Sequence, residues 1–245
     1  MSGDRKTKPG GVEDLYPFLH SGQGDLDSVL EEVRRSTVAK AEEIVALRET
    51  VLRREAPRLT ECARAMASSF AAGGKLLAFG NGGSSTDAQD VATMFLHPAD
   101  GARPLPALSL TSDIAVVTAL SNDIGFDVVY ARQIAALARP GDVALGLSTS
   151  GNSPNLIRAF DEAARRGLVT VGFAGYDGGK MAEVDTIDHL FVVSSASVHR
   201  IQEAQTTPCW ATCRPRRRSP TGCRSTGGTG VRTPASRRPW SHTWR

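Results

Sequence analysis

The stretch KLLAFGNGGSSTDAQDVATMFLH, residues 75–97, decides the predicted fold, because it joins a short apolar run to a glycine-rich turn and a helical pattern. Residues 142–154, DVALGLSTSGNSP, show the same order, with Ser153 expected to cap the next helix and Pro154 at its first position. A buried parallel strand followed by an amphipathic helix produces such a pattern. The two stretches therefore predict an α/β domain.

Three more apolar runs complete the predicted sheet. Together with the two above, the expected strands cover 75–79, 105–110, 142–147, 168–173 and 189–194. Helical patterns lie between the runs, and Asp113 is one of the polar residues that can cap the helix after the second run. Strands and helices that alternate in this way predict an open, doubly wound, five-stranded parallel sheet with helices on both faces.

Two helices are expected before the sheet, within residues 25–74. Ser28 and Glu31 have the spacing of a capping box at the start of the first helix. Apolar residues at steps of three and four form a long stripe between residues 26 and 51, and Pro57 separates this helix from a second one. Such a long stripe needs a partner surface.

Composition restricts the class of protein. The chain has 245 residues and 40% hydrophobic residues, which fits one domain with appendages. The sequence contains no run of about 18 apolar residues, so no transmembrane helix is predicted. Residues 1–24 are polar and glycine-rich, so we expect a flexible segment without the apolar stretch of a signal peptide. These features predict a cytoplasmic protein that does not bind membranes.

Residues 206–245 differ in character from the rest of the chain. They hold nine arginines and no acidic residue, whereas residues 1–205 hold 20 basic and 26 acidic residues. One interpretation is a disordered basic arm that binds nucleic acid; the other is a shifted reading frame in a GC-rich gene. We favour the shifted frame, because the helical pattern that begins at Val198 stops in mid-turn. Nucleic acid is therefore not an expected partner, and the domain itself is expected to span 75–205.

Two loops carry the chemistry. GNGGS at 80–84 and STSGNS at 148–153 each follow an apolar strand and precede a helix. In open α/β sheets ligands bind at the carboxyl ends of the strands, and a helix N-terminus offers free N–H groups to an anion. Neither loop has the GxxxxGK[ST] pattern of a nucleotide-triphosphate site. The plain alternative is that both are tight turns with helix caps.

The chain resembles the phosphoheptose isomerases, a branch of the sugar isomerase (SIS) domain family, over roughly residues 30–205. The motifs that carry this resemblance occur in the order and spacing of that branch: GNGGS (80–84), SNDIGFD (121–127), GLSTSGNSPNLI (146–157), DGGKMA (177–182) and HRIQEAQ (199–205). The resemblance implies interconversion of sedoheptulose 7-phosphate and an aldoheptose 7-phosphate. It also implies a homotetramer in which the N-terminal helices pack together, which fits the apolar stripe at 26–51, with active sites between subunits.

The resemblance implies a set of substrate-binding residues. The phosphate would be held by hydroxyl-bearing residues of the second loop, namely Ser148, Thr149, Ser150 and Ser153. The sugar would be lined by residues of the first loop and of two other motifs, namely Asn81, Gly82, Gly83, Ser84, Asn122, Asp123 and Gln202. The expected partner is therefore a phosphorylated sugar.

The chain departs from the family where the catalytic residues are expected. The family carries a His-x-x-x-Glu pair that binds zinc and supplies the acid/base, and here Asp90 and Met94 stand at those positions. Its last catalytic histidine corresponds to Trp210, so Gln202 alone of the zinc-binding set is unchanged. We therefore expect no metal site and name no cofactor. Asp90 and His97 are weak candidates for a substitute proton carrier.

Three functions remain open from the sequence. The first is an aldose–ketose isomerase, which the family favours. The second is a non-catalytic SIS protein that binds sugar phosphates, which the missing residues favour. The third is a nucleic-acid-binding protein, which rests on the arginine-rich tail alone.

Overall fold

The computed structural model describes residues 26–98 and 102–213. The expectations for residues 1–24, and for most of the segment 206–245, lie outside this part of the chain. Five strands form one sheet, with bounds β1 Leu76–Gly80, β2 Ala107–Ser109, β3 Val143–Leu147, β4 Val169–Gly175 and β5 His189–Val193. All pairs are parallel, and the strand order is β2-β1-β3-β4-β5. This confirms the predicted five-stranded α/β fold.

The strand order places a topological switch point between β1 and β3. The chain moves from β1 to β2 on one side and then returns to β3 on the other side of β1. Gly80 pairs with Leu147 in the register of these two strands. The loops that follow them therefore start side by side at the edge where ligands bind in doubly wound sheets.

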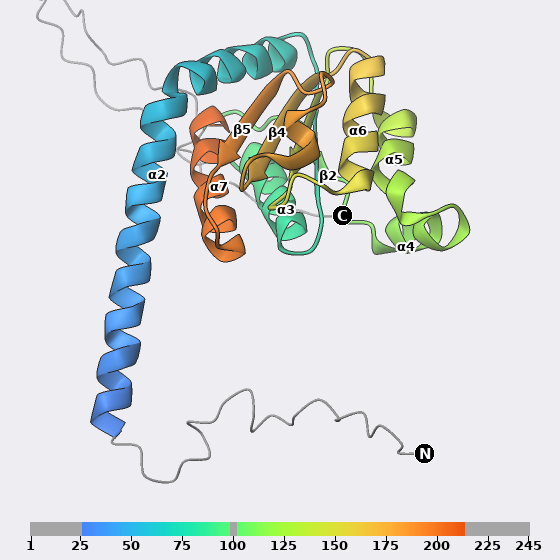
Figure 1. Cartoon of the computed structure of the whole chain (residues 1–245). Helices are drawn as coiled ribbons and strands as arrows, with labels where there is room; N and C mark the ends of the chain where they lie inside the picture. The colour runs from blue at the N-terminus through green and yellow to red at the C-terminus, as the bar shows by residue number, and fades with distance from the viewer. Residues whose placement is uncertain (1–25, 99–101, 214–245) are drawn as a thin grey trace, which may run out of the picture. The chain divides into compact units, whose positions relative to one another are not determined.

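Helices cover both faces of the sheet (Figure 1). One face carries a core built with α2 and α3, against which α7 also packs. The other face carries a core built with α5 and α6. The bounds of the helices are α2 Leu26–Ala71, α3 Gly83–Leu96, α4 Ile114–Asp123, α5 Val129–Leu137, α6 Pro154–Arg165 and α7 Val198–Cys213, with short 3-10 turns η3 Phe126–Val128 and η4 Gly179–Ala182.

The prediction of two N-terminal helices is wrong, because α2 is one helix of 46 residues that contains Pro57. It begins at Leu26, so Ser28 lies inside its first turn and does not precede it. Figure 1 shows that α2 bends, with a last section over the sheet and a first section that extends beyond it. A proline removes one backbone hydrogen bond and kinks a helix, and packing on both sides of the kink keeps the remainder helical.

Glu55 stabilises the region of this bend. It is buried, with 3% of its surface exposed, and it forms ion pairs with Arg54 at 3.1 Å and Arg58 at 2.7 Å. Arg58 also donates a hydrogen bond to the Leu190 carbonyl and lies 5.4 Å from the centre of the Phe191 ring. The bend is thereby tied to β5.

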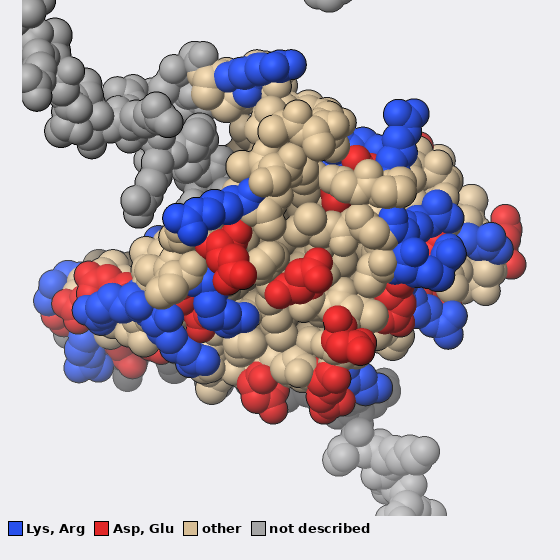
Figure 2. Space-filling model, turned by 90° about the horizontal axis from the view of Figure 1, so that it is seen from above, with Lys and Arg blue, Asp and Glu red and all other residues tan. Residues whose placement is uncertain are grey.

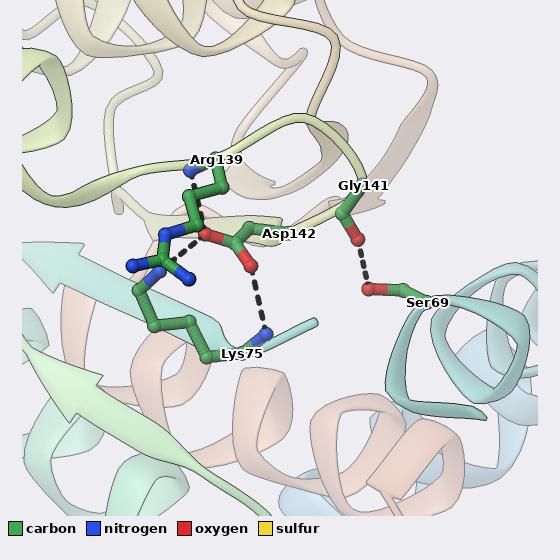
Figure 3. A network of polar contacts seen from close by, with 5 residues as sticks. All are labelled: Ser69, Lys75, Arg139, Gly141 and Asp142. Atoms are coloured by element: carbon green, nitrogen blue, oxygen red, sulfur yellow. Dashed lines mark hydrogen bonds and ion pairs between the residues drawn. The ribbon is translucent and has the colours of Figure 1, made fainter. Parts of the chain in front are cut away.

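A network of polar contacts joins the starts of β1 and β3 (Figure 3). The Asp142 carboxylate accepts hydrogen bonds from the Lys75 backbone N–H at 2.9 Å and the Arg139 backbone N–H at 2.8 Å. Lys75 Nζ lies 2.6 Å from the same carboxylate. The Ser69 hydroxyl, at the end of α2, donates to the Gly141 carbonyl. These contacts fix the amino edge of the sheet, opposite the two loops.

The start of α4 and the end of α7 test two other expectations, the helix cap at Asp113 and the end of the domain at Gln205. Asp113 caps α4 as predicted, since its Oδ1 accepts from the N–H groups of Ala115 and Val116 at 3.1 Å. Helix α7 continues past Gln205, the expected domain end, to Cys213. Within the described residues no helix combines the length and apolar character that crossing a membrane requires.

Candidate functional site

The loop after β1 turns directly into α3. Gly82 is the N-cap residue of α3, and the Asn81 and Gly82 carbonyls accept from the N–H groups of Ser84 at 3.0 Å and Ser85 at 2.9 Å. Ser84 is buried, with 4% of its surface exposed, whereas Gly82 and Gly83 are exposed. The backbone of the two glycines is thus the accessible part of the GNGGS loop.

The loop after β3 opens α6. Ser153 is the N-cap residue and Pro154 follows it, as predicted, but the Ser153 side chain makes no capping hydrogen bond. The Ser148 hydroxyl accepts from the Gly151 N–H at 3.0 Å, and the Ser150 hydroxyl accepts from the Asn152 N–H at 3.2 Å. Two hydroxyls therefore shape the loop, and that of Ser153 is not used for capping.

The DGGKMA segment, residues 177–182 after β4, packs against this second loop. Gly151 has a φ of +67°, and a Cβ atom there would lie 1.9 Å from the Gly178 carbonyl oxygen. The Asn152 Oδ1 accepts from the Lys180 N–H at 3.0 Å, and the Gly151 carbonyl accepts from the Met181 N–H at 3.0 Å. No residue with a side chain fits at Gly151, because the DGGKMA segment lies in contact with it.

Gln202 of α7 covers the start of α3. A Cβ atom built on Gly83 would lie 2.5 Å from the Gln202 Nε2 and 2.7 Å from its Oε1. Burial raises the pKa of Asp87, one turn along α3; a hydrogen bond from Gln202 opposes this rise, and the negative charge of Asp90 adds to it. The Oδ2 of Asp87 is buried and has no hydrogen-bond partner within the described residues. Gln202 is thus placed against the GNGGS loop as the sequence suggested.

The structure does not place all predicted residues together. Asn122 and Asp123 lie at the end of α4, which packs against η3 and α5, and the Asn122 Nδ2 donates to the Asp123 Oδ1 at 2.8 Å. His97 is the C-cap residue of α3, so it lies about 20 Å from Gly83 at 1.5 Å per helical residue. His97 is therefore not adjacent to the loop that begins α3.

The residues present do not fit the zinc ion that the family resemblance implies. Met94 is partly buried and packs against the core on the α3 face of the sheet. Asp90 is exposed, and Gln202 supplies a neutral amide oxygen. Among the side chains that the structure describes, those of residues 27–98 and 102–207, no three His, Cys, Asp or Glu are grouped closely enough to hold a metal ion. Two oxygen ligands fall short of the four ligands of a zinc centre.

Three buried polar side chains near the loops were not predicted. Asn155 is 1% exposed and pairs with Asn81. The Tyr130 hydroxyl donates to the Gly80 carbonyl at 2.5 Å. Gln205 is fully buried and its Nε2 donates to the Ser148 carbonyl at 3.0 Å. Gln205 follows Gln202 by three residues on a helix, a spacing that could have indicated a shared face.

The arrangement is suited to a ligand with an anionic group. The N-termini of α3 and α6 both point to the switch point, and each carries the partial positive charge of a helix start. Hydroxyls and backbone N–H groups, with no lysine or arginine in either loop, favour a phosphate monoester attached to a polar body.

Comparisons with known proteins agree with this geometry. The SIS domain family matches residues 41–175. The chain is 43% identical over 178 residues to a phosphoheptose isomerase from Nitratidesulfovibrio vulgaris (strain Hildenborough). This match covers 72% of this chain and 85% of that protein. The solved phosphoheptose isomerase from Neisseria gonorrhoeae has a TM-score of 0.68 and 36% identity, and covers 74% of this chain and 96% of its own.

A second solved phosphoheptose isomerase is also similar. It comes from Francisella tularensis, with a TM-score of 0.63 and 32% identity, and the match covers 78% of this chain and 97% of its own. The family match over residues 41–175 includes the two loops and the strands that carry them.

Proposed function

The chain belongs to the SIS domain family, and from this premise we propose that it is an aldose–ketose isomerase that acts on a seven-carbon sugar phosphate. The observation that carries the proposal is the pair of glycine- and hydroxyl-rich loops that open α3 and α6 at the β1–β3 switch point, in a chain about two-fifths identical to phosphoheptose isomerases. The proposed reaction interconverts sedoheptulose 7-phosphate and the corresponding aldoheptose 7-phosphate. The proposed compartment is the cytoplasm, where phosphorylated sugars are metabolised.

The second loop is the proposed phosphate site. Ser148, Thr149, Ser150 and Ser153 surround the N-terminus of α6, whose free N–H groups would add to their hydroxyls. The side chain of Ser153 is not engaged in capping, so its hydroxyl can donate to a phosphate oxygen. The glycines of the first loop let the sugar approach the backbone closely, with Gln202 beside them.

Isomerisation moves a proton from the carbon next to the carbonyl to the carbonyl carbon, through an enediol, and a base must carry it. Met94 cannot carry a proton, and Asp87 has its second oxygen buried away from solvent. Asp90 is exposed on the same helix. We therefore assign the proton transfer to Asp90, within a site that a second subunit completes.

A homotetramer is the proposed assembly. The section of α2 that extends beyond the sheet exposes Leu30 at 56%, Val33 at 56% and Val45 at 56% of their surface. Leu30 and Val33 belong to the apolar stripe that the sequence predicted, whereas Ile44 and Val51 of the same stripe are buried within the chain. Burying a stripe of this kind between copies of the chain removes apolar surface from water. Light scattering coupled to size exclusion measures the assembly directly.

The decisive experiment is an assay with sedoheptulose 7-phosphate. It should be run on the full chain and on a chain in which the reading frame after codon 205 is restored. Turnover is expected to fall at least about a hundredfold in Asp90→Asn, the usual contribution of a general base. Asp161→Asn, an exposed carboxylate on α6, is the matched control and should be unchanged.

A non-catalytic binding protein is the second candidate, and the observation in its favour is Met94 packed against the core where the family has glutamate. It predicts a thermal shift with sugar phosphates and no turnover by either form of the chain. For the third candidate, Figure 2 shows acidic side chains interspersed with basic ones on the face seen from above. That face carries no continuous basic surface of the kind that nucleic acid requires.

A further inference from the structure

A reciprocal pair of asparagine amides joins the two loops. The Asn81 Nδ2 donates to the Asn155 Oδ1 at 2.9 Å, and the Asn155 Nδ2 donates to the Asn81 Oδ1 at 2.8 Å. Asn81 lies in the GNGGS loop, and Asn155 is the second residue of α6, directly after the STSGNS loop. The pair is therefore a side-chain connection between the starts of α3 and α6, beside the backbone pairing of β1 and β3.

Tyr130 of α5 adds a third member. Its hydroxyl lies 2.5 Å from the Gly80 carbonyl and 3.2 Å from the Asn81 Oδ1. It is 3% exposed, and its ring lies 5.5 Å from that of Phe79 on β1. Burial raises the pKa of Tyr130 to about 12, so the hydroxyl stays a neutral donor at neutral pH. The tyrosine thus fixes the backbone position from which the GNGGS loop departs.

These bonds occupy the side chain of Asn81. Its oxygen accepts from Asn155 and faces Tyr130, and one hydrogen of its amide is donated to Asn155. A side chain used in this way orients the loop and leaves substrate contact to the neighbouring backbone. A buried network whose members are all bonded is rigid and specifies one arrangement.

We propose that Asn155 and Tyr130 are positioning residues, which act through Asn81 to hold the sugar-binding loop at a fixed separation from the phosphate-binding loop. The assignment of one loop to the sugar and of the other to the phosphate rests on the proposed function. A sugar phosphate that spans both loops depends on their separation, since a small misplacement of a reacting group lowers the rate strongly. Inorganic phosphate occupies one loop only and does not depend on it.

Three variants of the full chain test this role. Asn155→Leu removes the amide pair with little change in volume, and Tyr130→Phe removes the hydroxyl alone. Gln133→Met is the matched control: Gln133 is buried on the same helix as Tyr130, and its amide donates to the Leu110 and Val129 carbonyls and to neither loop. Each variant is assayed for kcat, for KM with sedoheptulose 7-phosphate and for inhibition by inorganic phosphate.

The expected result is a fall in kcat/KM of about tenfold in Asn155→Leu, because both hydrogen bonds of the amide pair are lost. A smaller fall is expected in Tyr130→Phe. The inhibition constant of inorganic phosphate should stay the same in both. Gln133→Met should lose thermal stability to a similar degree but keep its kcat/KM. A kcat/KM that falls as far in the control, or not at all in Asn155→Leu, overturns the proposal.

Hydrogen exchange separates this inference from the proposed function. The backbone amides of residues 81–84 should exchange at least about tenfold faster in Asn155→Leu than in Gln133→Met, because the lost bonds lower the local opening free energy. This measurement needs no turnover. If no chain shows turnover but the amides still exchange faster in Asn155→Leu, the isomerase is rejected and the loop connection is kept. Equal exchange in both variants rejects the connection whatever the activity.

Discussion

Replacing Asp142 by asparagine tests whether the amino edge of the sheet is held by one carboxylate. Asp142 has 3% of its side chain exposed and accepts three hydrogen bonds, two from backbone N–H groups and one from the Lys75 ammonium. Asparagine has the same shape but only one accepting oxygen. If that oxygen keeps the Lys75 N–H, the new NH₂ group faces the N–H of Arg139, and two donors meet.

The expected loss follows from these contacts. One buried N–H without an acceptor costs about 1–3 kcal/mol, and the bond to the ammonium adds about 1 kcal/mol, a reduced value because 28% of the Lys75 side chain is exposed to water. We therefore expect Asp142→Asn to lower the free energy of unfolding by about 2–4 kcal/mol, out of a total that is about 5–15 kcal/mol for a typical domain.

The same carboxylate gives a dependence on pH. Burial alone would raise the pKa of Asp142, but the hydrogen bonds from Lys75 and Arg139 and the charge of Lys75 outweigh it and hold the pKa below its ordinary value. A lowered pKa in the folded chain stabilises it above the ordinary value of 3.8, and this contribution is lost as the pH falls through the folded pKa. The difference between the two chains should thus be full at neutral pH and should shrink below about pH 4.

Urea unfolding followed by far-ultraviolet circular dichroism measures both effects at one fixed protein concentration. Asp161→Asn is the control, since its exposed carboxylate accepts one bond from Thr186 and should change stability by less than about 0.5 kcal/mol. A loss no greater than that of the control, or a difference that does not shrink in acid, would refute the reasoning.

Three further outcomes are expected. Gly151→Ala should lower stability by about 2–3 kcal/mol and abolish the thermal shift caused by inorganic phosphate, because a Cβ atom collides with the Gly178 carbonyl; a normal phosphate shift would contradict this. Glu55→Gln should lower stability by only about 1 kcal/mol, since both partner arginines are exposed, and the loss should diminish at high salt in urea unfolding. In an alkaline titration of tyrosinate absorbance, a step near the pKa of about 12 of Tyr130 should be present in the natural chain and missing in Tyr130→Phe. Because that pKa is raised in the folded chain, the stability it contributes is full below pH 10 and declines as the pH rises from about 10 to 12.

The sequence was sufficient to predict the sheet because its central strands, β1, β3 and β4, are buried on both faces. Runs such as residues 143–147, fully buried in β3, are continuous and apolar and cannot be mistaken for surface segments. The positions of the two loops followed from the same runs, since glycine and hydroxyl residues come directly after them, whereas the binding role of the loops stays a prediction.

The single helix α2 and the residues behind the loops could not be predicted in this way. Pro57 reads locally as a break, and tertiary packing at Glu55 and Leu59 keeps the helix continuous. Asn155 and Tyr130 are separated from Asn81 by 74 and 49 residues along the chain. Their contact depends on the strand order, which periodicity does not reveal. The contact between Gly178 and Gly151 likewise depends on the strand order and could not be predicted from periodicity.

The amide pair between Asn81 and Asn155 also bears on the chemical ageing of the protein. An asparagine followed by glycine, as in Asn81-Gly82, is the dipeptide most prone to deamidation, because the next backbone nitrogen can attack the side-chain carbonyl and close a succinimide ring. That attack requires the side chain to rotate away from its partners. Because the oxygen and nitrogen of Asn81 are both bonded to Asn155, such a rotation costs two hydrogen bonds. The bonds that fix the loop thus also preserve its covalent structure over the lifetime of the folded chain.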